Sequence, residues 1–461
     1  MKVLFKGEAP LKVLFFFEEE SHISDFSKKK KLFEGKEGDF YWQVKDSEIA
    51  LWVGLGKKSE TNFFSLLKTG VLVAKKIAKT QEAQVEFSLL ELGDKETFFI
   101  AQGFFLQSLF SYSLKEKKEP SFLKETIFKT PFVQLIHKAQ SLAQTRNWIR
   151  ELVDTPSNIL TPQSFALQIK EAFKESAVKV EIWDFDRVQK ENLTGLNYVG
   201  KGSDNPPYFV KLHYAPKGAK QSLSLIGKGI TFDSGGLSLK PTDSMLDMKS
   251  DMAGAATVAG IFQLALKNNL PIELYGFLPL AENMVSGKAY KVGDIITYNN
   301  QKSVEITNTD AEGRLILADA LILASNEKPS FMIDIATLTG ACMVALGTDI
   351  YGVFANNQEE GQKYVDFVNK ESSDFAWSLP LFSRYQEGLK SKIADLKNTG
   401  KRWGGAISAA LFLKEFVDNK KNWMHFDIAG PSFDEGLGLF DGQATGVPLE
   451  SLYLYLENLA K

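Results

Sequence analysis

The chain has few of the side chains on which most zinc and nucleophile sites are built: one cysteine, Cys342, and four histidines among 461 residues. A single cysteine excludes an intrachain disulfide and a zinc site made of several thiolates. The HExxH motif of the commonest single-zinc proteases is absent, and so is the GxSxG motif of nucleophile-elbow hydrolases. Any catalytic chemistry must therefore rest mainly on carboxylates, lysines and arginines.

Long hydrophobic runs are also absent. In the opening stretch MKVLFKGEAPLKVLFFFEEE, charges at Lys6, Glu8 and Lys12 interrupt apolar runs that are too short for a signal segment. No stretch approaches the roughly 20 apolar residues needed to span a bilayer. We therefore expect a protein that does not enter a membrane and stays in the cytoplasm, which the scarcity of cysteine also suits.

Neither sign of charge predominates, because 54 lysines and arginines face 57 acidic residues, for a net charge of -3. Composition thus gives no electrostatic reason to expect nucleic acid as the main partner. A basic patch formed only in an oligomer would escape this count, so a secondary role in binding DNA stays open. The length exceeds what one compact core supports and predicts at least two domains.

The composition changes along the chain. Residues 1–130 are rich in Phe, Lys and Glu and predict a small α/β domain, with a helix at 64–78 and strands that include 12–17, 48–55 and 95–103. Residues 131–153 carry apolar side chains at every third or fourth position, which is typical of a helix and suits a link between two domains.

Residues 154–461 alternate apolar strands with helical segments. This order predicts an α/β domain with a mostly parallel central sheet flanked by helices. Ligands in such domains bind at the carboxyl ends of the strands. We therefore expect this larger domain to carry the functional site.

Two polar segments of this domain gather the candidate catalytic groups. The first, IGKGITFDSGGLSLKPTDSMLDMKSDMAGAA, carries Lys228, Asp233, Lys240 and Asp251, and the second, TNTDAEGRL, carries Asp310, Glu312 and Arg314. Each follows a predicted strand and leads into a predicted helix. We expect both to emerge at the same edge of the sheet.

The acidic residues of these segments predict a metal site. Four carboxylates in one crevice would repel one another and raise each other's pKa unless cations were present. Two divalent ions would neutralise them, and two-metal sites use about this number of ligands. Asp and Glu oxygens bind Zn²⁺, Mn²⁺ and Mg²⁺, with Co²⁺ as a further candidate, so the metal identity stays open.

Each motif also has a purely structural interpretation. A D-x-E-x-R triplet alone is usually a surface salt-bridge patch. The GKG at 227–229 lacks the spacing of a phosphate-binding loop. His425 and Asp427 share one face of a strand and are better explained as a buried hydrogen-bonded pair than as ligands. Asp319, within an apolar helix, is better explained by hydrogen bonds in the core, and Gly254 and Gly260 indicate a closely packed helix beneath the site.

Several motifs in the right order resemble the leucyl aminopeptidase (cytosol aminopeptidase) family of dimetal exopeptidases. They are GKGITFDSGGLSLKP, MKSDMAGAA, NTDAEGRL and DIATLTGAC, and the resemblance covers about residues 150–461. It implies release of N-terminal residues, preferably leucine or other apolar ones, from peptides by attack of a metal-bridging water. It also implies a homo-hexamer.

The resemblance implies a set of metal ligands: Lys228, Asp233, Asp251, Asp310 and Glu312. Of these, Asp233 and Glu312 would bridge the two ions, Asp251 and Lys228 would complete the more exchangeable site, and Asp310 would serve the tighter one. A lysine coordinates only through a neutral amine, so the two cations would have to keep Lys228 deprotonated.

The same resemblance assigns the remaining roles. Lys240 would polarise the peptide carbonyl, and Arg314 would hold a bicarbonate ion that serves as general base in place of histidine. The positions of the side-chain pocket are Met248, Thr337, Gly340 and Ala429.

Other functions remain to be separated from this one. A phosphoester hydrolase would use the same carboxylate-rich dimetal logic, and phosphate assays would distinguish it. A salt-dependent gel shift would detect DNA binding. Hydrolysis of cysteinyl-glycine in thiol turnover is a possible variant of the peptidase activity.

Overall fold

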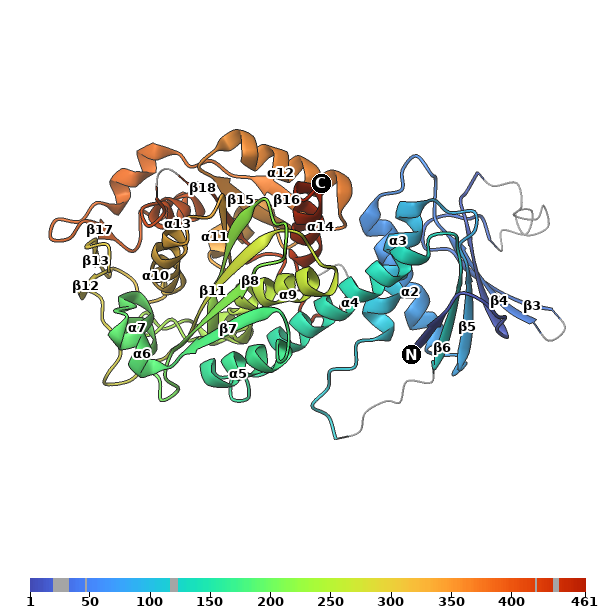
Figure 1. Cartoon of the computed structure of the whole chain (residues 1–461), viewed down its shortest axis with the longest axis horizontal. Coiled ribbons are helices and arrows are strands. Elements are labelled where there is room, and N and C mark those ends of the chain that lie inside the picture. The colour runs from blue at the N-terminus through green and yellow to red at the C-terminus, as the bar shows by residue number, and fades with distance from the viewer. Residues whose placement is uncertain (20–32, 46–47, 117–122, 419–420, 434–438) are drawn as a thin grey trace. The chain divides into compact units, whose positions relative to one another are not determined.

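The computed structural model describes residues 1–19, 33–45, 48–116, 123–418, 421–433 and 439–461. The chain forms two compact units, Met1–Asn147 and Trp148–Lys461 (Figure 1). The division falls within α4 (Val133–Asp154), the helix that occupies the segment with helical periodicity. Among the described residues, no helix is both long and apolar enough to cross a membrane.

The N-terminal unit is built on a six-stranded sheet whose strands are all parallel to their neighbours except β3, at one edge. Two helices, α2 (Phe63–Ile77) and α3 (Asp94–Ser108), pack together and lie against this sheet (Figure 1). In spatial order the strands are β1 (Lys2–Leu4), β6 (Glu125–Lys129), β5 (Gln84–Ser88), β2 (Leu11–Phe16), β4 (Glu48–Gly54) and β3 (Phe40–Lys45).

The prediction of a strand at 95–103 is wrong, because this segment lies in α3. Its Phe and Ile side chains favour strands by propensity. The apolar run continues to Leu106, however, which is longer than a typical strand, and helix α3 buries it on several sides. Asp94 and Glu96 in the first turn complement the positive end of the helix dipole.

The C-terminal unit contains the predicted mostly parallel sheet. At its centre β18, β14, β9 and β11 run parallel, while antiparallel pairs lie toward both edges. In spatial order the strands are β16 (Phe375–Ser378), β15 (Ile350–Ala355), β18 (Asn422–Asp427), β14 (Phe331–Ala336), β9 (Ser222–Gly227), β11 (Glu273–Asn283), β8 (Tyr208–Tyr214) and β7 (Val178–Trp183), and β10 (Gly229–Asp233) pairs with the end of β11.

Helices flank this sheet (Figure 1). The buried helix α10 packs against β9, β11, β14 and α13, and α9 packs against β9, β14 and α14. A small sheet of three short strands, β12 (Ile295–Thr297), β13 (Ser303–Glu305) and β17 (Leu396–Lys397), lies beside them. The helices are α5 (Pro162–Ala172), α6 (Phe185–Lys190), α7 (Thr194–Gly200), α8 (Thr242–Met245), η1 (Met248–Ser250), α9 (Ala253–Lys267), α10 (Gly313–Asn326), α11 (Gly340–Leu346), α12 (Gln358–Glu371), η2 (Ser383–Leu389), α13 (Gly405–Lys414) and α14 (Leu449–Leu459).

Two predictions about the core of this unit are confirmed. A Cβ on Gly254 would lie 2.0 Å from the carbonyl oxygen of Ile335, and one on Gly260 would lie 2.5 Å from Ile149, so α9 packs as closely as expected. Asp319 on α10 is buried, and its Oδ2 accepts a hydrogen bond of 2.8 Å from the backbone N–H of Leu196. This carboxylate serves the N-terminal turn of α7, away from the carboxylates of the two polar segments.

Candidate metal and catalytic site

The two polar segments meet at one edge of the central sheet. Lys228 directly follows β9, Asp233 ends β10, and Asp251 directly follows η1. Glu312 is the N-cap of α10, with Asp310 two residues before it. The strand that precedes this second segment is β13, which belongs to the small sheet, so only the first segment extends strands of the central sheet. The N-terminus of α10 brings the second segment to the edge instead.

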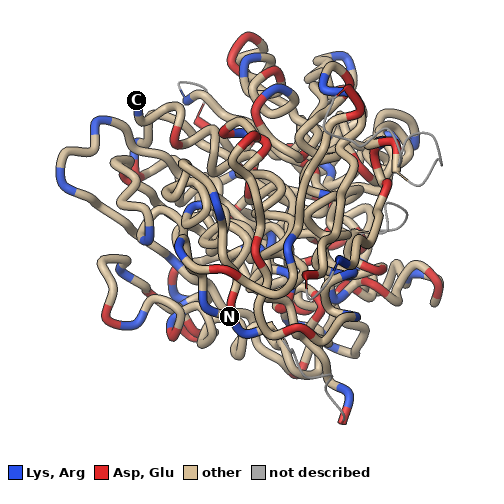
Figure 2. Tube along the Cα trace, turned by 90° about the vertical axis from the view of Figure 1, so that its right-hand side faces the viewer, with Lys and Arg blue, Asp and Glu red and all other residues tan. Residues whose placement is uncertain are grey.

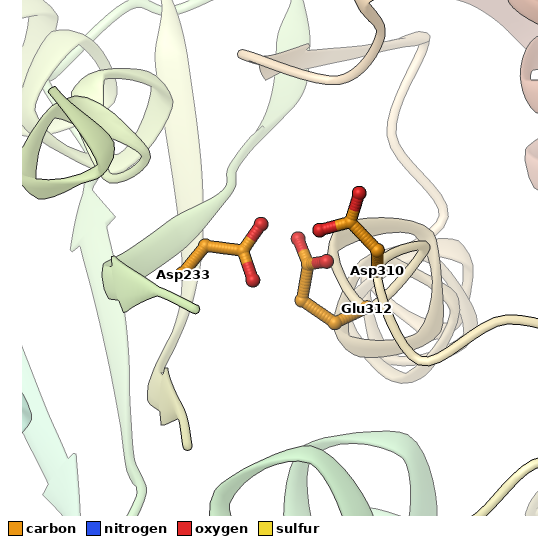
Figure 3. A group of neighbouring side chains, drawn as sticks. All are labelled: Asp233, Asp310 and Glu312. Atoms are coloured by element: carbon orange, nitrogen blue, oxygen red, sulfur yellow. The ribbon is translucent and has the colours of Figure 1, made fainter. Parts of the chain in front are cut away.

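Three carboxylates from the two segments converge at this edge. Asp233, Asp310 and Glu312 each offer one oxygen, and these oxygens all lie within 4.8 Å of one another. Figure 3 shows the three side chains pointing toward a common centre, Asp233 from its strand and the other two from the start of α10. This convergence is that of a ligand set for a cation.

Two lysines tie the carboxylates together. Lys228 Nζ lies 2.8 Å from Asp251 Oδ1 and 3.0 Å from Glu312 Oε1. Lys240 Nζ lies 2.9 Å from Asp233 Oδ2 and 2.5 Å from Asp310 Oδ1. The structure thus brings the five residues expected to bind metal, together with Lys240, into one cluster.

Glycines make this arrangement possible. A Cβ on Gly313 would lie 2.4 Å from Lys228 Cε, so only glycine at this position lets the lysine cross the start of α10. Gly235 and Gly236 have φ values of +84° and +63°, in the left-handed region that glycine adopts without strain, and they turn the chain between Asp233 and Lys240.

Burial shifts the pKa values of the carboxylates. Burial raises the pKa of Asp251 to about 7, with the carboxylate of Glu312 adding to the shift. Burial and neighbouring carboxylates also raise the pKa of Asp233 and of Asp310. For Glu312, burial raises the pKa, but Lys228 and Lys240 outweigh it and leave the pKa below its ordinary value. The cluster carries more negative charge than its own lysines stabilise.

The basic groups are also buried. Burial lowers the pKa of Lys228, but Asp251, Glu312 and Asp233 outweigh it and leave a net rise, so the protein by itself favours the ammonium form. Burial lowers the pKa of Arg314 to about 10, and its Nη1 donates a hydrogen bond of 2.7 Å to the carbonyl of Asn398. Its buried Nε finds no acceptor among the described residues.

The residues fit divalent cations. Asp251 Oδ2 and Glu312 Oε2 are buried, and no hydrogen-bond donor in the described part of the chain reaches them. Such orphaned carboxylate oxygens are costly, because burial removes their water. Four carboxylates against two lysines leave an excess of two negative charges, which Arg314 reduces only in part. A set of carboxylate oxygens and one amine suits Zn²⁺ or Mn²⁺.

Of the four expected pocket residues, Thr337 contacts this cluster and Met248 lies in the turn that precedes Asp251. Thr337 Oγ1 donates to Asp251 Oδ1 at 2.8 Å, and Met248 begins η1, the turn that ends at Asp251. Gly340 is the first residue of α11, and Ala429 follows β18. The carboxylate of Asp427 accepts backbone N–H bonds from Ala429, Leu338 and Thr339, which ties these two segments together.

Sequence analysis missed two residues that support the site, Asn283 and Asn398. Asn283, at the end of β11, donates hydrogen bonds to Asp233 and to the backbone of Thr309. Asn398 accepts from Arg314 through its carbonyl and from the backbone of Thr307 through its side chain. For Asn283 a signal exists in the sequence: it is a polar residue at the carboxyl end of an apolar strand, where ligands bind in α/β domains.

His425 is buried and hydrogen-bonded, as expected, but its partner is Asp334 and not Asp427. The two residues face each other on the adjacent parallel strands β18 and β14, and Nδ1 lies 2.6 Å from Asp334 Oδ1. Trp423 Nε1 donates to the other oxygen at 2.7 Å. No described metal-site carboxylate contacts this histidine through a hydrogen bond.

A carboxylate cluster at the edge of a mostly parallel sheet defines an α/β protein with a candidate metal centre. The model of the cytosol aminopeptidase family, catalytic domain, matches residues 147–453. The chain therefore belongs to the cytosol aminopeptidase family. The predicted resemblance is confirmed, and so is the two-domain α/β fold.

Curated relatives align over most of both chains. The probable cytosol aminopeptidase of Rhodopirellula baltica is 40% identical over 436 residues, which cover 92% of this chain and 84% of that protein. The probable cytosol aminopeptidase of Sulfurihydrogenibium sp. is 37% identical over 460 residues, which cover 95% and 90%. The similarity thus includes the N-terminal unit.

Solved structures agree. The bottromycin maturation enzyme BotP in complex with Mn superposes with a TM-score of 0.91 at 30% identity, covering 98% of this chain and 100% of that one. A mutant of tomato leucine aminopeptidase gives a TM-score of 0.88 at 30% identity, covering 99% and 96%.

Proposed function

We propose that this chain is a dimetal aminopeptidase that releases N-terminal residues, preferably leucine or other apolar ones, from peptides. One observation carries the proposal: Asp233, Asp310 and Glu312 present oxygens within 4.8 Å of one another in a cluster with orphaned buried oxygens. A structure that is similar over the full chain contains Mn. Family membership favours a peptide over a phosphoester as the substrate.

Five residues would hold the two ions: Lys228, Asp233, Asp251, Asp310 and Glu312. Asp233 and Glu312 would be shared by both ions. When bound, two divalent ions would lower the pKa of a water molecule and polarise the peptide carbonyl. Zn²⁺ and Mn²⁺ are the leading candidates, followed by Mg²⁺ and Co²⁺.

Lys228 is the least expected ligand. Its ammonium form is favoured by the carboxylates alone, so its service as a neutral amine depends on the added positive charge. Its contact with the carbonyl of Thr337, at 2.9 Å, uses one N–H donor that a neutral amine retains. The buried amine can therefore keep this orientation after losing a proton.

Lys240 and Arg314 have separate roles. The Lys240 side chain is 16% exposed, in contrast to the enclosed Lys228, and substrate can reach it. It would bind the carbonyl oxygen of the scissile bond and stabilise the developing negative charge. Arg314, with a buried Nε that has no acceptor in the described structure, would hold bicarbonate, which supplies a general base.

The proposed site would also explain why cleavage occurs at the N-terminus of the peptide. The free α-amino group of the substrate would bind one of the metal ions, which limits cleavage to the N-terminal residue. The apolar Met248 and Ala429, with Thr337 and Gly340, would surround the first side chain. We further propose that the chain acts in the cytoplasm as a homo-hexamer.

Charge does not favour DNA as the main partner. Figure 2 shows lysines and arginines interspersed with acidic residues along the described trace. Binding of DNA, if present, would be secondary to peptide hydrolysis and strongly salt-dependent.

The direct test is hydrolysis of leucine p-nitroanilide after the purified protein has been stripped with chelator. Activity should return on addition of Mn²⁺ or Zn²⁺ and should stay absent from an Asp310→Ala variant. A folded protein that is inactive with every metal would refute the proposal, and turnover of p-nitrophenyl phosphate in its place would redirect it to phosphoesters.

A further inference from the structure

Asn283, at the end of β11, links the two polar segments of the site through hydrogen bonds. It is the last residue of β11 and pairs in parallel register with Asp233, the last residue of β10. Its side chain is completely buried. Asn283 lies outside the two polar segments, so the sequence motifs give it no role in binding or catalysis.

Both hydrogen bonds of the Asn283 amide nitrogen are directed at the site. Nδ2 donates to Asp233 Oδ1 at 2.8 Å and to the carbonyl oxygen of Thr309 at 3.0 Å. Asp233 belongs to the first polar segment, and Thr309 precedes Asp310 in the second. One amide group therefore fixes a carboxylate of one segment relative to the backbone of the other.

The orientation of this amide is determined by its neighbours. A flipped amide would place Oδ1 against a carboxylate oxygen and a carbonyl oxygen, two acceptors that offer no proton. With the observed orientation, Oδ1 faces Gly236, where an added Cβ would lie 3.0 Å from it. Side-chain amides that donate to a metal-ligating carboxylate orient that ligand.

Further contacts hold the acceptors in place. Asp233 Oδ1 also accepts from the backbone of Gly235 at 2.9 Å, and Tyr290 donates its hydroxyl to the Thr309 carbonyl at 2.6 Å. Thr309 Oγ1 donates to the carbonyl of Gly235 at 2.7 Å. Asn283 alone among these groups touches the Asp233 carboxylate and the second segment at once.

We propose that Asn283 is a positioning residue that sets the separation of Asp233 from Asp310, and thereby the affinity for the metal ion that these two carboxylates would hold together. The inference rests on the proposed dimetal function. Without the amide, Asp233 loses a donor on the oxygen opposite Lys240, and the second segment loses its tie to β11. The ligand set then has to be ordered by the metal itself, at the expense of affinity.

In the experiment, the chelator-stripped protein is titrated with Mn²⁺ alone, and the heat of binding is measured by isothermal titration calorimetry. Asn283→Ala removes the amide and leaves a cavity, and Asn283→Leu removes the amide but keeps the number and branching of its heavy atoms, so that a cavity effect can be separated. Asn356→Ala is the matched control, because Asn356 donates to the carbonyl of Lys421 at 2.7 Å and accepts from the backbone of Trp423 at 2.9 Å, without contact to a site carboxylate. Circular dichroism establishes that each variant is folded.

We expect the dissociation constant of the Mn²⁺ ion held between Asp233 and Asp310 to rise about 10- to 100-fold in both Asn283 variants, the usual effect of losing a group that orients a ligand. Peptidase kcat should recover at saturating Mn²⁺, which loss of folded structure would not allow. Wild-type affinity in a folded Asn283→Leu variant would overturn the inference alone. A wild-type protein that binds no Mn²⁺ would instead overturn the proposed function.

Discussion

Two buried aspartates of the C-terminal unit differ in how their oxygens are satisfied. Asp334 lies within β14, and each of its oxygens has a side-chain partner, His425 at 2.6 Å and Trp423 at 2.7 Å. Asp251 receives Lys228 and Thr337 on Oδ1, both at 2.8 Å, and Oδ2 has no donor in the described structure. Both aspartates are buried, so they differ mainly in whether each carboxylate oxygen has a hydrogen-bond donor.

This difference separates a structural carboxylate from a functional one. A satisfied buried carboxylate contributes to stability and specifies the strand pairing around it. An unsatisfied one is costly to the protein alone and is retained where a ligand provides the missing interaction. The substitutions below test this distinction.

The largest contrast is expected between Asp251→Asn and Asp334→Asn. Asp251→Asn should weaken Mn²⁺ binding by more than about 100-fold, because it removes a ligand and not merely its support. Its stability without metal should stay close to wild type, because neutralising this carboxylate removes a desolvation cost. Mn²⁺ titration and urea unfolding in chelator measure the two effects.

Asp334→Asn should show the reverse. Removing one partner of a buried charged pair costs about 3–5 kcal/mol of unfolding free energy. The folded variant should bind Mn²⁺ as the wild type does. A large stability loss in Asp251→Asn with little in Asp334→Asn would contradict the assignment of roles.

Lys240 provides a sharper test of chemistry against binding. Lys240→Met should lower kcat by about 100- to 1000-fold, because it removes a donor to the developing oxyanion. KM should change far less. The surface substitution Lys390→Met, which removes only an exposed pair with Glu387, is the control. Equal losses in both variants would exclude the role given to Lys240.

Gly313 tests whether the position of Lys228 matters. Gly313→Ala places a Cβ only 2.4 Å from Lys228 Cε, which is too close for two carbon atoms that are not bonded. The lysine should therefore shift and move its amine away from Asp251 and Glu312. We expect metal affinity to fall about tenfold, as for other changes that misorient a ligand. Gly287→Ala, where an added Cβ meets nothing within 4 Å, controls for the loss of backbone freedom.

The smallest expected effect is a pH dependence of stability that comes from the buried pair of His425 and Asp334. Burial lowers the pKa of His425, but Asp334 outweighs it and raises the pKa above its ordinary value. The stabilisation is therefore complete below about pH 6.5, the ordinary value of histidine, and is lost as the pH rises through the raised value. Urea unfolding in chelator should show this decline in wild type and not in His425→Gln. A variant with the wild-type slope would exclude His425 as its source.

Much of the fold was predictable from sequence because its signals are local. Strands β9, β11 and β14 are apolar runs, and their alternation with helices predicts the parallel centre of the sheet. Helix α3 was not predictable in the same way, because a Phe-rich run has strand propensity and only tertiary burial favours the helix.

The site shows the same division. Acidic residues in two short motifs predict the cluster, because carboxylates that meet in one crevice repel one another and favour a bound cation. Sequence did not reveal that β13, outside the main sheet, precedes Asp310, nor that Asn283 supports Asp233. The place of Asn283 at the end of an apolar strand marks it as a candidate, but its partner Asp233 lies 50 residues away, and the small sheet pairs β13 with the distant β17, so a local pattern specifies neither contact.

The number of Mn²⁺ ions bound by the stripped protein tests the central claim most directly. Equilibrium dialysis followed by elemental analysis should give two ions per wild-type chain and fewer in Asp310→Ala. A folded wild-type protein that binds no Mn²⁺, and no Zn²⁺ under the same conditions, would contradict the account of these carboxylates as metal ligands.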